Sequence, residues 1–512
     1  MSLMDTQKIT KNKLGIINLF LAAMSGCLLV LAFPRFNWFF VAWFALAPLL
    51  FAIYHSSFKG ALFCSLMAGI VFFGGLLYWL FIFGLLAGFS LILCQAIFIL
   101  LFGLGAKLIH SYFKKPLRLI FIPALWVSIE FIRSIGPWGF SWGVLGYSQH
   151  NFLPVIQIAR WAGVFGISFL LVFVNEFIAE SYISAFCPSW SLKNSVKVFS
   201  KNIIVVLIGV FLLTGIGYFN LLGSQKNENT TKIAILQPSI PQEIKWEPMK
   251  KEDIFNIHLK LARKAAEKKP QFIIWPETAT PAYLMREKEY LKEIKSLAKE
   301  TNSYLIVGGL REEKGCYFNS VFIFSPEGEK LGHYDKLHLV PFGEYVPLRP
   351  LFSNIKAVAA VTEDMSAGDK LAVFETDRGK FSTVICFESA DSLLVHRLAS
   401  KGAEMLVVIT NDGWFKRTAA AEQHLSMAVL RAVENDFFVV QAANTGISAV
   451  IDSRGRVLSE TALFERRYLL DEVTLKEGKS FYRRFGNLFS YCCILISFGC
   501  FLFIIYSKNR AY

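Results

Sequence analysis

Eight long apolar stretches most strongly constrain how this chain can fold. Each is long enough, or nearly so, to cross a lipid bilayer, and each is bounded by charged residues, Pro or Gly. They lie at 16–33, 39–54, 61–80, 87–109, 119–135, 162–182, 202–222 and 488–506. With 54% hydrophobic residues among 512 and a mean hydropathy of +0.45, the chain is predicted to be a multi-span helical membrane protein. The first two stretches are short, so they can form a helical hairpin, and a total of seven or nine spans stays open.

The Lys and Arg residues of the short loops predict the orientation of these spans, because cations collect on the cytoplasmic side of a membrane. With the N-terminus inside, the inner loops hold thirteen of them: Lys8, Lys11, Lys13, Lys59, Lys107, Lys114, Lys115, Arg118, Lys193, Lys197, Lys201, Lys508 and Arg510. The outer short loops hold three: Arg35, Arg133 and Arg160. We therefore expect both termini in the cytoplasm and residues 223–487 outside it. These cations also account for the net charge of +14, so we expect no nucleic-acid partner.

The polar stretch between the last two apolar segments has a different periodicity. Strands are predicted at 232–237, 272–277, 304–309, 317–325, 371–376, 381–387, 405–411, 437–443 and 447–452. Helices are predicted at 252–268, 287–300, 389–400 and 419–434. Continuous apolar strands mixed with helices are typical of a layered α/β domain. The predicted organisation is a membrane domain of about seven spans at 1–222, an α/β domain at 223–487, and a last span with a short tail at 488–512.

Only two of the nine cysteines, Cys316 and Cys386, fall in this α/β domain. They give neither a disulfide framework nor a metal-ligand spacing, so neither a metal nor another cofactor is expected. Outside the cytoplasm the two thiols could still form one disulfide. Against this interpretation, Cys386 lies deep in an apolar run and is accompanied by acidic and basic residues.

Three chemically active side chains, Glu277, Lys336 and Cys386, lie at or near the ends of short apolar runs. A cysteine thiolate attacks ester or amide carbonyls, but it needs a base to take its proton and a cation to hold the developing oxyanion. Glu277 and Lys336 suit those two tasks. Taken alone, each is more typical of a helix cap or a surface charge. Taken together, the three predict acyl transfer by a membrane-anchored enzyme.

The motifs that hold these residues carry a family resemblance. In this order, Trp275–Thr278, Tyr334–Pro347 and Ile385–Glu388 resemble the Glu-Lys-Cys triad motifs of the nitrilase superfamily. With seven spans before the domain and one after it, the whole chain resembles the bacterial apolipoprotein N-acyltransferases, which are membrane-anchored members of that superfamily. The domain motifs are highly specific, whereas the membrane part matches mainly by the number and position of its spans. The resemblance implies a nitrilase-like α-β-β-α sandwich.

The resemblance also implies a two-step reaction in the bacterial cytoplasmic (inner) membrane, with the catalytic domain on the periplasmic side. Cys386 would attack the acyl ester of a phospholipid, with phosphatidylethanolamine as the expected donor, and would keep the acyl chain as a thioester. The α-amine of the diacylglyceryl cysteine that begins an apolipoprotein would then take the chain. Glu277 would act as the general base and Lys336 as the cation near the oxyanion.

Five further residues receive supporting roles from the same resemblance. Glu344 would orient Lys336 or assist proton transfer, and Asn319 would support the triad. Glu388 and Trp246 match positions that shape the site and the access of lipid. Phe387 departs from the family pattern, because a Tyr usually follows the nucleophile. The missing phenol hydroxyl changes the surroundings of Cys386, but we do not expect it to remove the activity.

The stretch from Pro347 to Lys370 shows no clean period and is long for a loop in a compact domain. Its apolar residues are consistent with a lid that touches lipid. They are equally consistent with a loop that packs on its own domain.

Three other functions stay open. A membrane-anchored nitrilase-type amidase would use the same triad to pass the acyl group of a small amide to water. A thiol protease would need a histidine partner, but no histidine of the domain, His424 included, has the expected sequence surroundings, so changing each to Ala should leave acyl-enzyme formation largely intact. A transporter would bury charges in its spans, for which Glu130 and Arg133 are among the few candidates.

Overall fold

The structure, a computed structural model, describes residues 3–185, 192–222, 230–346, 349 and 364–510. The chain divides into two compact units. Residues Met1–Gly223 and Asn487–Tyr512 form the first, and residues Ser224–Gly486 form the second.

The first unit consists of apolar helices. Within the described residues, six helices are long and apolar enough to cross a membrane. They are α1 (Leu3–Ala32), α3 (Phe58–Leu76), α4 (Leu85–Tyr112), α7 (Ala159–Ala185), α8 (Leu192–Leu222) and α16 (Leu488–Arg510). The remaining helical elements are η1 (Phe39–Trp43), α2 (Ala47–His55), η2 (Tyr78–Phe83), α5 (Lys115–Ser134), η3 (Leu145–Gln149) and α6 (Leu153–Ile156).

Two of the eight predicted spans differ from a simple apolar helix. Residues 39–54 are divided into the 3-10 turn η1 and the nine-residue helix α2. Of residues 119–135, all but the last lie in the continuous helix α5, which carries several charged side chains and an internal proline, Pro123. The number of spans and their orientation therefore stay a prediction.

The buried charges of α5 bind the loop that follows this helix. The Glu130 carboxylate accepts a hydrogen bond from the backbone N–H of Leu145 (2.7 Å). The Arg133 guanidinium donates to the backbone carbonyls of Phe140 (2.7 Å) and Trp142 (2.8 Å). Buried polar groups need such partners, because burying them without hydrogen bonds is costly. These contacts give the two charges a structural role.

Small residues allow close contact between neighbouring helices of this unit. A Cβ atom at Gly103 of α4 would lie 1.7 Å from Ser65 Oγ of α3, and one at Gly69 of α3 would lie 2.9 Å from the backbone of Ala96. Apolar helices surrounded by lipid associate mainly through such close van der Waals packing.

The second unit contains two β-sheets. The first has the order β13-β1-β2-β4-β5-β6, with β3 paired to β4, and the second has the order β12-β11-β10-β9-β8-β7. The strands of the first sheet are β1 (Thr231–Gln237), β2 (Phe272–Ile274), β3 (Thr280–Tyr283), β4 (Tyr304–Glu313), β5 (Cys316–Phe324), β6 (Lys330–Asp335) and β13 (Arg467–Val473). Those of the second are β7 (Val373–Thr376), β8 (Gly379–Ile385), β9 (Met405–Thr410), β10 (Phe438–Ala443), β11 (Ala449–Ile451) and β12 (Val457–Glu460).

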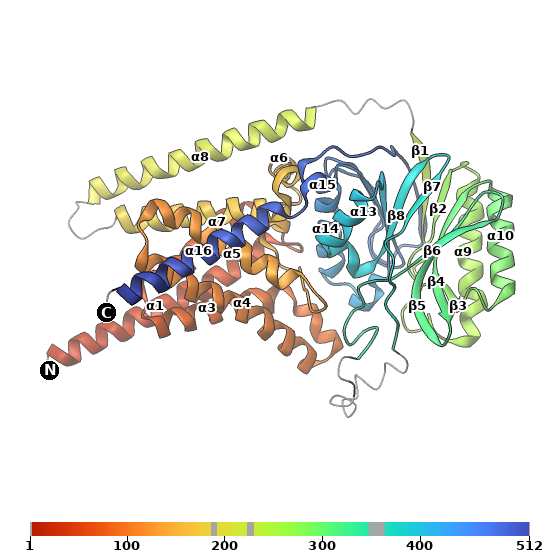
Figure 1. Cartoon of the computed structure of the whole chain (residues 1–512). Helices are drawn as coiled ribbons and strands as arrows, with labels where there is room; N and C mark the ends of the chain where they lie inside the picture. Colours follow the sequence, from red (N-terminus) through yellow and green to blue (C-terminus); the bar gives the residue numbers. More distant parts are fainter. Residues whose placement is uncertain (1–2, 186–191, 223–229, 347–348, 350–363, 511–512) are drawn as a thin grey trace. The chain divides into compact units, whose positions relative to one another are not determined.

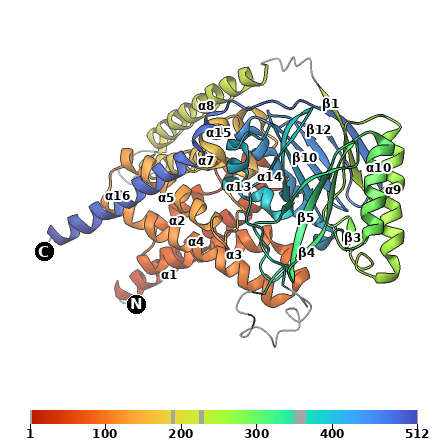
Figure 2. The same cartoon turned by 45° about the vertical axis from the view of Figure 1, so that its right-hand side comes forward.

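Helices cover the outer faces of the two sheets. The helical elements of this unit are η4 (Pro248–Lys250), α9 (Lys251–Ala266), α10 (Lys288–Thr301), η5 (Cys386–Ala390), α13 (Ser392–Ser400), η6 (Asp412–Phe415), α14 (Ala420–Asn435) and α15 (Phe481–Phe485). Figure 1 shows α9 and α10 beside the first sheet, and α13 and α14 beside the second. The same order of layers is visible after a 45° turn in Figure 2. The unit is thus an α-β-β-α sandwich, which confirms the predicted fold class.

Two apolar cores hold these layers together. Between the sheets, Ile235 and Ile274 of the first pack in one buried cluster with Ile385 and Val407 of the second. Outside the first sheet, a second cluster joins its strands to α9 and α10. Burying one such side chain contributes about 1.5–3 kcal/mol, so the sheet interface fixes the strand ends that carry the site.

The two interpretations of the stretch from Pro347 to Lys370, a lid or a packed loop, fall mostly outside the described residues, which include only Arg349 and residues 364–370 of it. At its ends, Arg349 forms an ion pair with Asp364, and the backbone N–H of Val346 donates to the same carboxylate (3.0 Å). The beginning and end of this stretch are therefore joined.

Candidate active site

Cys386 lies at a sharp turn between a strand and a helical element. It directly follows β8 and opens η5, and its backbone has a φ of +54°. A non-glycine residue adopts this left-handed conformation only at a cost of about 1–3 kcal/mol, and such strain is typical of functional sites. Cys316 and Cys386 are both free thiols, so the alternative that they form a disulfide is wrong.

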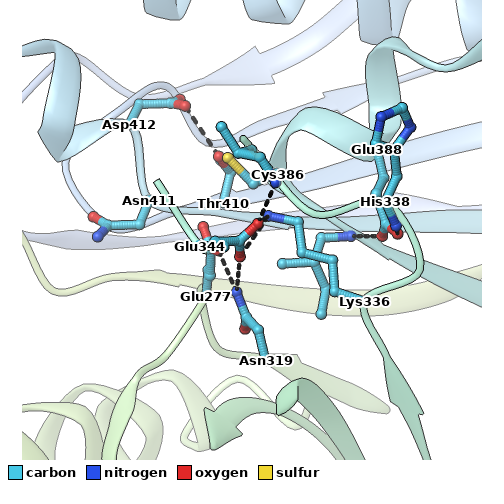
Figure 3. Close-up of polar contacts among 12 residues, drawn as sticks. Glu277, Asn319, Lys336, His338, Glu344, Cys386, Glu388, Thr410, Asn411 and Asp412 are labelled. Carbon is cyan, nitrogen blue, oxygen red and sulfur yellow. Dashed lines mark hydrogen bonds and ion pairs between the residues drawn. The ribbon is translucent and has the colours of Figure 1, made fainter. Parts of the chain in front are cut away.

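Lys336 follows β6 directly and is almost completely buried, with 1% of its surface exposed. Its Nζ lies 2.8 and 2.9 Å from the two carboxylate oxygens of Glu344, and 3.9 Å from Glu277 Oε1. Asn319 of β5 donates from Nδ2 to Glu277 Oε1 (2.8 Å) and to Glu344 Oε1 (3.1 Å). These four side chains form one buried hydrogen-bonded cluster (Figure 3).

A close approach of two backbones positions Glu277. This residue lies beyond the end of β2, and a Cβ atom at Gly308 of β4 would meet the carbonyl oxygen of Pro276 at 2.2 Å. Only glycine at 308 leaves room for the segment that carries the Glu277 carboxylate. Glu344 is held separately, because its Oε2 accepts a hydrogen bond from the backbone N–H of Val340 (2.8 Å).

Glu388 joins the loop of Lys336 to the turn of Cys386. Its buried carboxylate accepts hydrogen bonds from the backbone N–H groups of Ile385 (2.8 Å), Leu337 (2.7 Å) and His338 (3.0 Å). The hydroxyl of Tyr334 donates to both carboxylate oxygens at 2.9 Å. One side chain thus fixes residues on either side of the site, and we assign it a positioning role.

The electrostatics of the cluster leave the thiol protonated and the amine charged. Burial raises the pKa of the Cys386 thiol, the Glu277 carboxylate raises it further, and Lys336 acts in the opposite direction. Burial alone would lower the pKa of Lys336, but the Glu344 and Glu277 carboxylates raise it well above its usual value. Cys386 therefore needs a base before it can attack, and Lys336 is a permanent cation.

Lys245 is a second buried lysine beside this cluster, which the sequence analysis did not single out. Its Nζ donates to the backbone carbonyl of Glu277 (3.0 Å), and only 2% of the residue is exposed. Burial lowers its pKa to about 8, against the attraction of Glu277 and Cys386. Near neutral pH, Lys245 and Lys336 together balance the charges of Glu277 and Glu344.

Replacing Lys245 by Met should separate stability from activity. The lowered pKa means that the charged lysine costs up to about 3 kcal/mol of unfolding free energy below pH 8, and this cost disappears as the pH rises towards 10.5. We expect Lys245→Met to be the more stable protein at pH 7 and to lose most of that advantage by pH 10. Acyl-enzyme formation should fall on the order of tenfold, because one nearby charge in a protein interior is worth about 1–2 kcal/mol.

Unfolding temperatures of the two proteins, measured from pH 7 to 10, check this prediction. Lys250→Met is the matched control, since the Lys250 side chain is 48% exposed and pairs with Asp253 on the surface. If the difference in unfolding temperature between Lys245→Met and the parent stayed constant across this range, the assignment of a destabilising buried charge would be refuted.

Trp246 and Phe387 lie at the edge of the site rather than in the cluster. Trp246 is 46% exposed, and the Lys245 ammonium lies 6.0 Å from the centre of its ring. Phe387 is partly buried, and its ring makes an edge contact with that of His338 at 5.6 Å. The structure therefore brings together Glu277, Lys336, Glu344, Asn319 and Glu388 around the Cys386 turn, and leaves the two aromatic residues outside.

A polar network on the other side of Cys386 was also missed from the sequence. Thr410 ends β9, and its hydroxyl donates to Asp412 Oδ1 (3.0 Å), as Figure 3 shows. Asp412 also lies 3.1 Å from Nδ1 of His424 on α14. The available signal was the polar run that begins at Asn411, since it directly follows a buried strand next to β8.

The groups in this arrangement are those that nucleophilic acyl transfer needs. They are a thiol, a carboxylate and a charged amine, all largely buried. In the described part of the chain, no group of three or more His, Cys, Asp or Glu side chains could hold a metal ion.

Comparisons with known proteins show which families the chain resembles. Residues 232–483 match the family model for carbon-nitrogen hydrolases, and residues 25–177 match the model for the N-terminal domain of apolipoprotein N-acyltransferase. Among solved structures, Saccharomyces cerevisiae Nit3, a member of branch 10 of the nitrilase superfamily, is 19% identical with a TM-score of 0.39. The match covers 52% of this chain and 97% of Nit3.

Curated relatives align over both units of the chain. An apolipoprotein N-acyltransferase from Geobacter metallireducens is 37% identical and covers 93% of this chain and 92% of its own length. One from Haemophilus ducreyi is 30% identical, covering 93% of this chain and 94% of its own length. With this identity over nearly the whole of both chains, the protein belongs to the apolipoprotein N-acyltransferase family.

Proposed function

We propose that this protein moves an acyl chain from a membrane phospholipid to the N-terminal amine of a diacylated apolipoprotein, with Cys386 as the carrier. The observation that supports this most is the buried cluster of Glu277 and Lys336 at the strained turn of Cys386, in a chain whose relatives are named for this reaction. We also infer that phosphatidylethanolamine is the donor, and that residues 223–487 lie on the periplasmic side of the inner membrane with both termini in the cytoplasm.

The first step charges the enzyme. Glu277 takes the proton of the Cys386 thiol, and the sulfur attacks the carbonyl carbon of the phospholipid ester. The oxyanion that forms is stabilised by the Lys336 ammonium. When the intermediate collapses, the C–O bond of the ester breaks, protonated Glu277 returns the proton to the departing oxygen, and a lysophospholipid leaves. The acyl chain remains on Cys386 as a thioester.

The second step transfers the chain. The α-amine of the diacylglyceryl cysteine attacks the thioester carbonyl, Glu277 takes a proton from this amine, and Lys336 again stabilises the oxyanion. The C–S bond breaks, an amide forms, and the thiolate of Cys386 recovers its proton from Glu277. Donor and acceptor use the same groups in turn, which gives a ping-pong mechanism.

Supporting residues hold the reacting groups in place. Glu344 and Asn319 fix the Lys336 ammonium and the Glu277 carboxylate relative to each other. Glu388 joins the backbone of the loop that follows Lys336 to the backbone of the Cys386 turn. We assign Trp246 and Phe387 to the rim, where apolar rings can contact acyl chains. The membrane helices keep the enzyme at the bilayer that holds the acyl chains, since withdrawing an acyl chain into water costs about 0.8 kcal/mol per CH₂ group.

Labelled substrates test this function. The purified protein is incubated with a phospholipid that carries a labelled acyl chain, together with a diacylated peptide that has a free N-terminus. We expect a labelled N-acyl peptide and lysophospholipid. The same peptide with an acetylated N-terminus is the control and should stay unlabelled. Labelled free fatty acid without labelled peptide would overturn the proposal in favour of an amidase-like hydrolase.

A further inference from the structure

A buried histidine, His424, forms a hydrogen bond with the backbone carbonyl of Cys386. Nε2 of His424 lies 3.1 Å from the carbonyl oxygen of Cys386 and 2.7 Å from Ser389 Oγ, and its Nδ1 lies 3.1 Å from Asp412 Oδ1. The side chains of His424 and Asp412 are 1% and 0% exposed. The contact of His424 with Cys386 is to the backbone carbonyl, and its contact with Asp412 leads to the Thr410 hydroxyl, so the backbone and Asp412 connect this histidine to the nucleophile.

The partners of His424 decide its protonation. A backbone carbonyl and a carboxylate can only accept hydrogen bonds, so each ring nitrogen must donate for both contacts to exist. The ring is then an imidazolium that is paired with the Asp412 carboxylate. The pKa agrees with this reading: burial alone would lower the pKa of His424, but the Asp412 carboxylate raises it above its usual value.

The contacts on the two sides of Cys386 complement each other. Before it, the N–H of Ile385 is held by the Glu388 carboxylate. After it, the carbonyl of Cys386 is held by His424. The residue between them has the strained φ of +54°, which persists only where the surroundings impose it. Asp412 adds a second connection, because the Thr410 hydroxyl that it binds also forms a hydrogen bond with the Cys386 side chain.

The geometry points to His424 as a positioning residue that, oriented by Asp412, holds the carbonyl of Cys386 and thereby keeps the nucleophile turn in its reactive conformation. The inference rests on the proposed function only in naming Cys386 as the nucleophile. It replaces, for His424, the sequence-based expectation that substituting any histidine of the domain leaves acyl-enzyme formation largely intact.

Two amide substitutions separate the two nitrogens of His424. The amide nitrogen of Gln reaches the place of Nε2 and can donate to the Cys386 carbonyl. That of Asn reaches the place of Nδ1 and can only replace the partner of Asp412. We expect His424→Asn to slow acyl-enzyme formation on the order of 10²-fold, because small misplacements of reacting groups have effects of this size. His424→Gln should stay within about tenfold of the parent, and neither should change the KM for the donor.

The initial rate of acyl mass gain on Cys386 is measured for both variants, with unfolding temperatures as a check on folding. A purely structural ion pair predicts the opposite order, because Asn preserves the contact with Asp412; equal rates, or a faster Asn variant, overturn the inference. Ser389→Ala is the mild control, since it removes only the other partner of Nε2, and it should keep the parental rate. A loss as large as that of His424→Asn would show that His424 acts through Ser389 instead.

A second readout needs no lipid. The rate at which iodoacetamide alkylates Cys386, followed on the peptide that contains it, should rank the variants in the same order. If the alkylation rates rank the variants in this order but the parent gains no acyl mass from phospholipid, the proposed function fails and the inference stands. If acyl transfer occurs but both readouts ignore the identity of residue 424, the inference fails alone.

Discussion

Replacing Cys386 by Ala is expected to lower acyl transfer by at least about 10⁴-fold and to abolish the acyl-enzyme. The reason is that the sulfur forms the covalent bond to the acyl chain, and removal of a nucleophile leaves only binding and oxyanion stabilisation. Cys386→Ser keeps the shape but replaces a thiol by a far less acidic hydroxyl, so it should be nearly as inactive. The measurement is the rate of N-acyl peptide formation from labelled phospholipid.

Cys316→Ala is the matched control for this prediction. Cys316 is the other cysteine of the α/β unit, and it lies exposed at the beginning of β5. We expect its substitution to leave the rate unchanged. Full activity of Cys386→Ala, or an equal loss in Cys316→Ala, would show that the acyl chain is carried elsewhere.

Replacing Lys336 by Met is expected to damage both catalysis and stability. Without the ammonium, the carboxylates of Glu277 and Glu344 lose the cation between them and keep only their neutral hydrogen bonds from Asn319 and the backbone. Breaking a buried pair in this way costs about 3–5 kcal/mol of unfolding free energy. The oxyanion also loses its cation, so acyl-enzyme formation should fall on the order of 10³-fold.

The pH dependence gives this prediction a distinct signature. Two close carboxylates bind a proton more readily than isolated ones, so the folded variant takes up protons that the unfolded chain does not. Its stability deficit against the parent should therefore shrink as the pH falls from 8 to 5. Unfolding temperatures measure it, with Lys330→Met on the exposed part of β6 as the control. A deficit that does not depend on pH would contradict the charge balance described above.

The strands could be predicted where a continuous run of apolar residues marks a strand that is buried along its length. The strands β9 and β10 are buried along their whole length, and their continuous apolar runs predicted them almost to the residue. The strand β6 was missed, because of its side chains only Tyr334 is buried and the rest read as a polar loop. For the same reason β3, β12 and β13 were not predicted: short or half-exposed strands depend on pairing partners far away in the chain.

The candidate site was predictable where its residues carry the chemistry themselves. Glu277, Lys336 and Cys386 stood out as a carboxylate, an amine and a thiol at or near the ends of short apolar runs, and the packing of the two sheets brings them together. Lys245 could not be recognised, since what identifies it is a hydrogen bond to the backbone of a distant residue. His424 was likewise set aside, because its partners come from other elements and its helix, α14, is buried on nearly every side.

The most direct measurement follows one acyl chain through a single turnover. The protein is first incubated with a phospholipid carrying a heavy-isotope acyl chain, and the peptide that contains Cys386 is weighed. We predict the mass of the heavy acyl group on this peptide, its disappearance when a diacylated peptide acceptor is added, and its arrival on the α-amine of the acceptor. Labelled acceptor that forms while the Cys386 peptide never carries the chain would contradict the account.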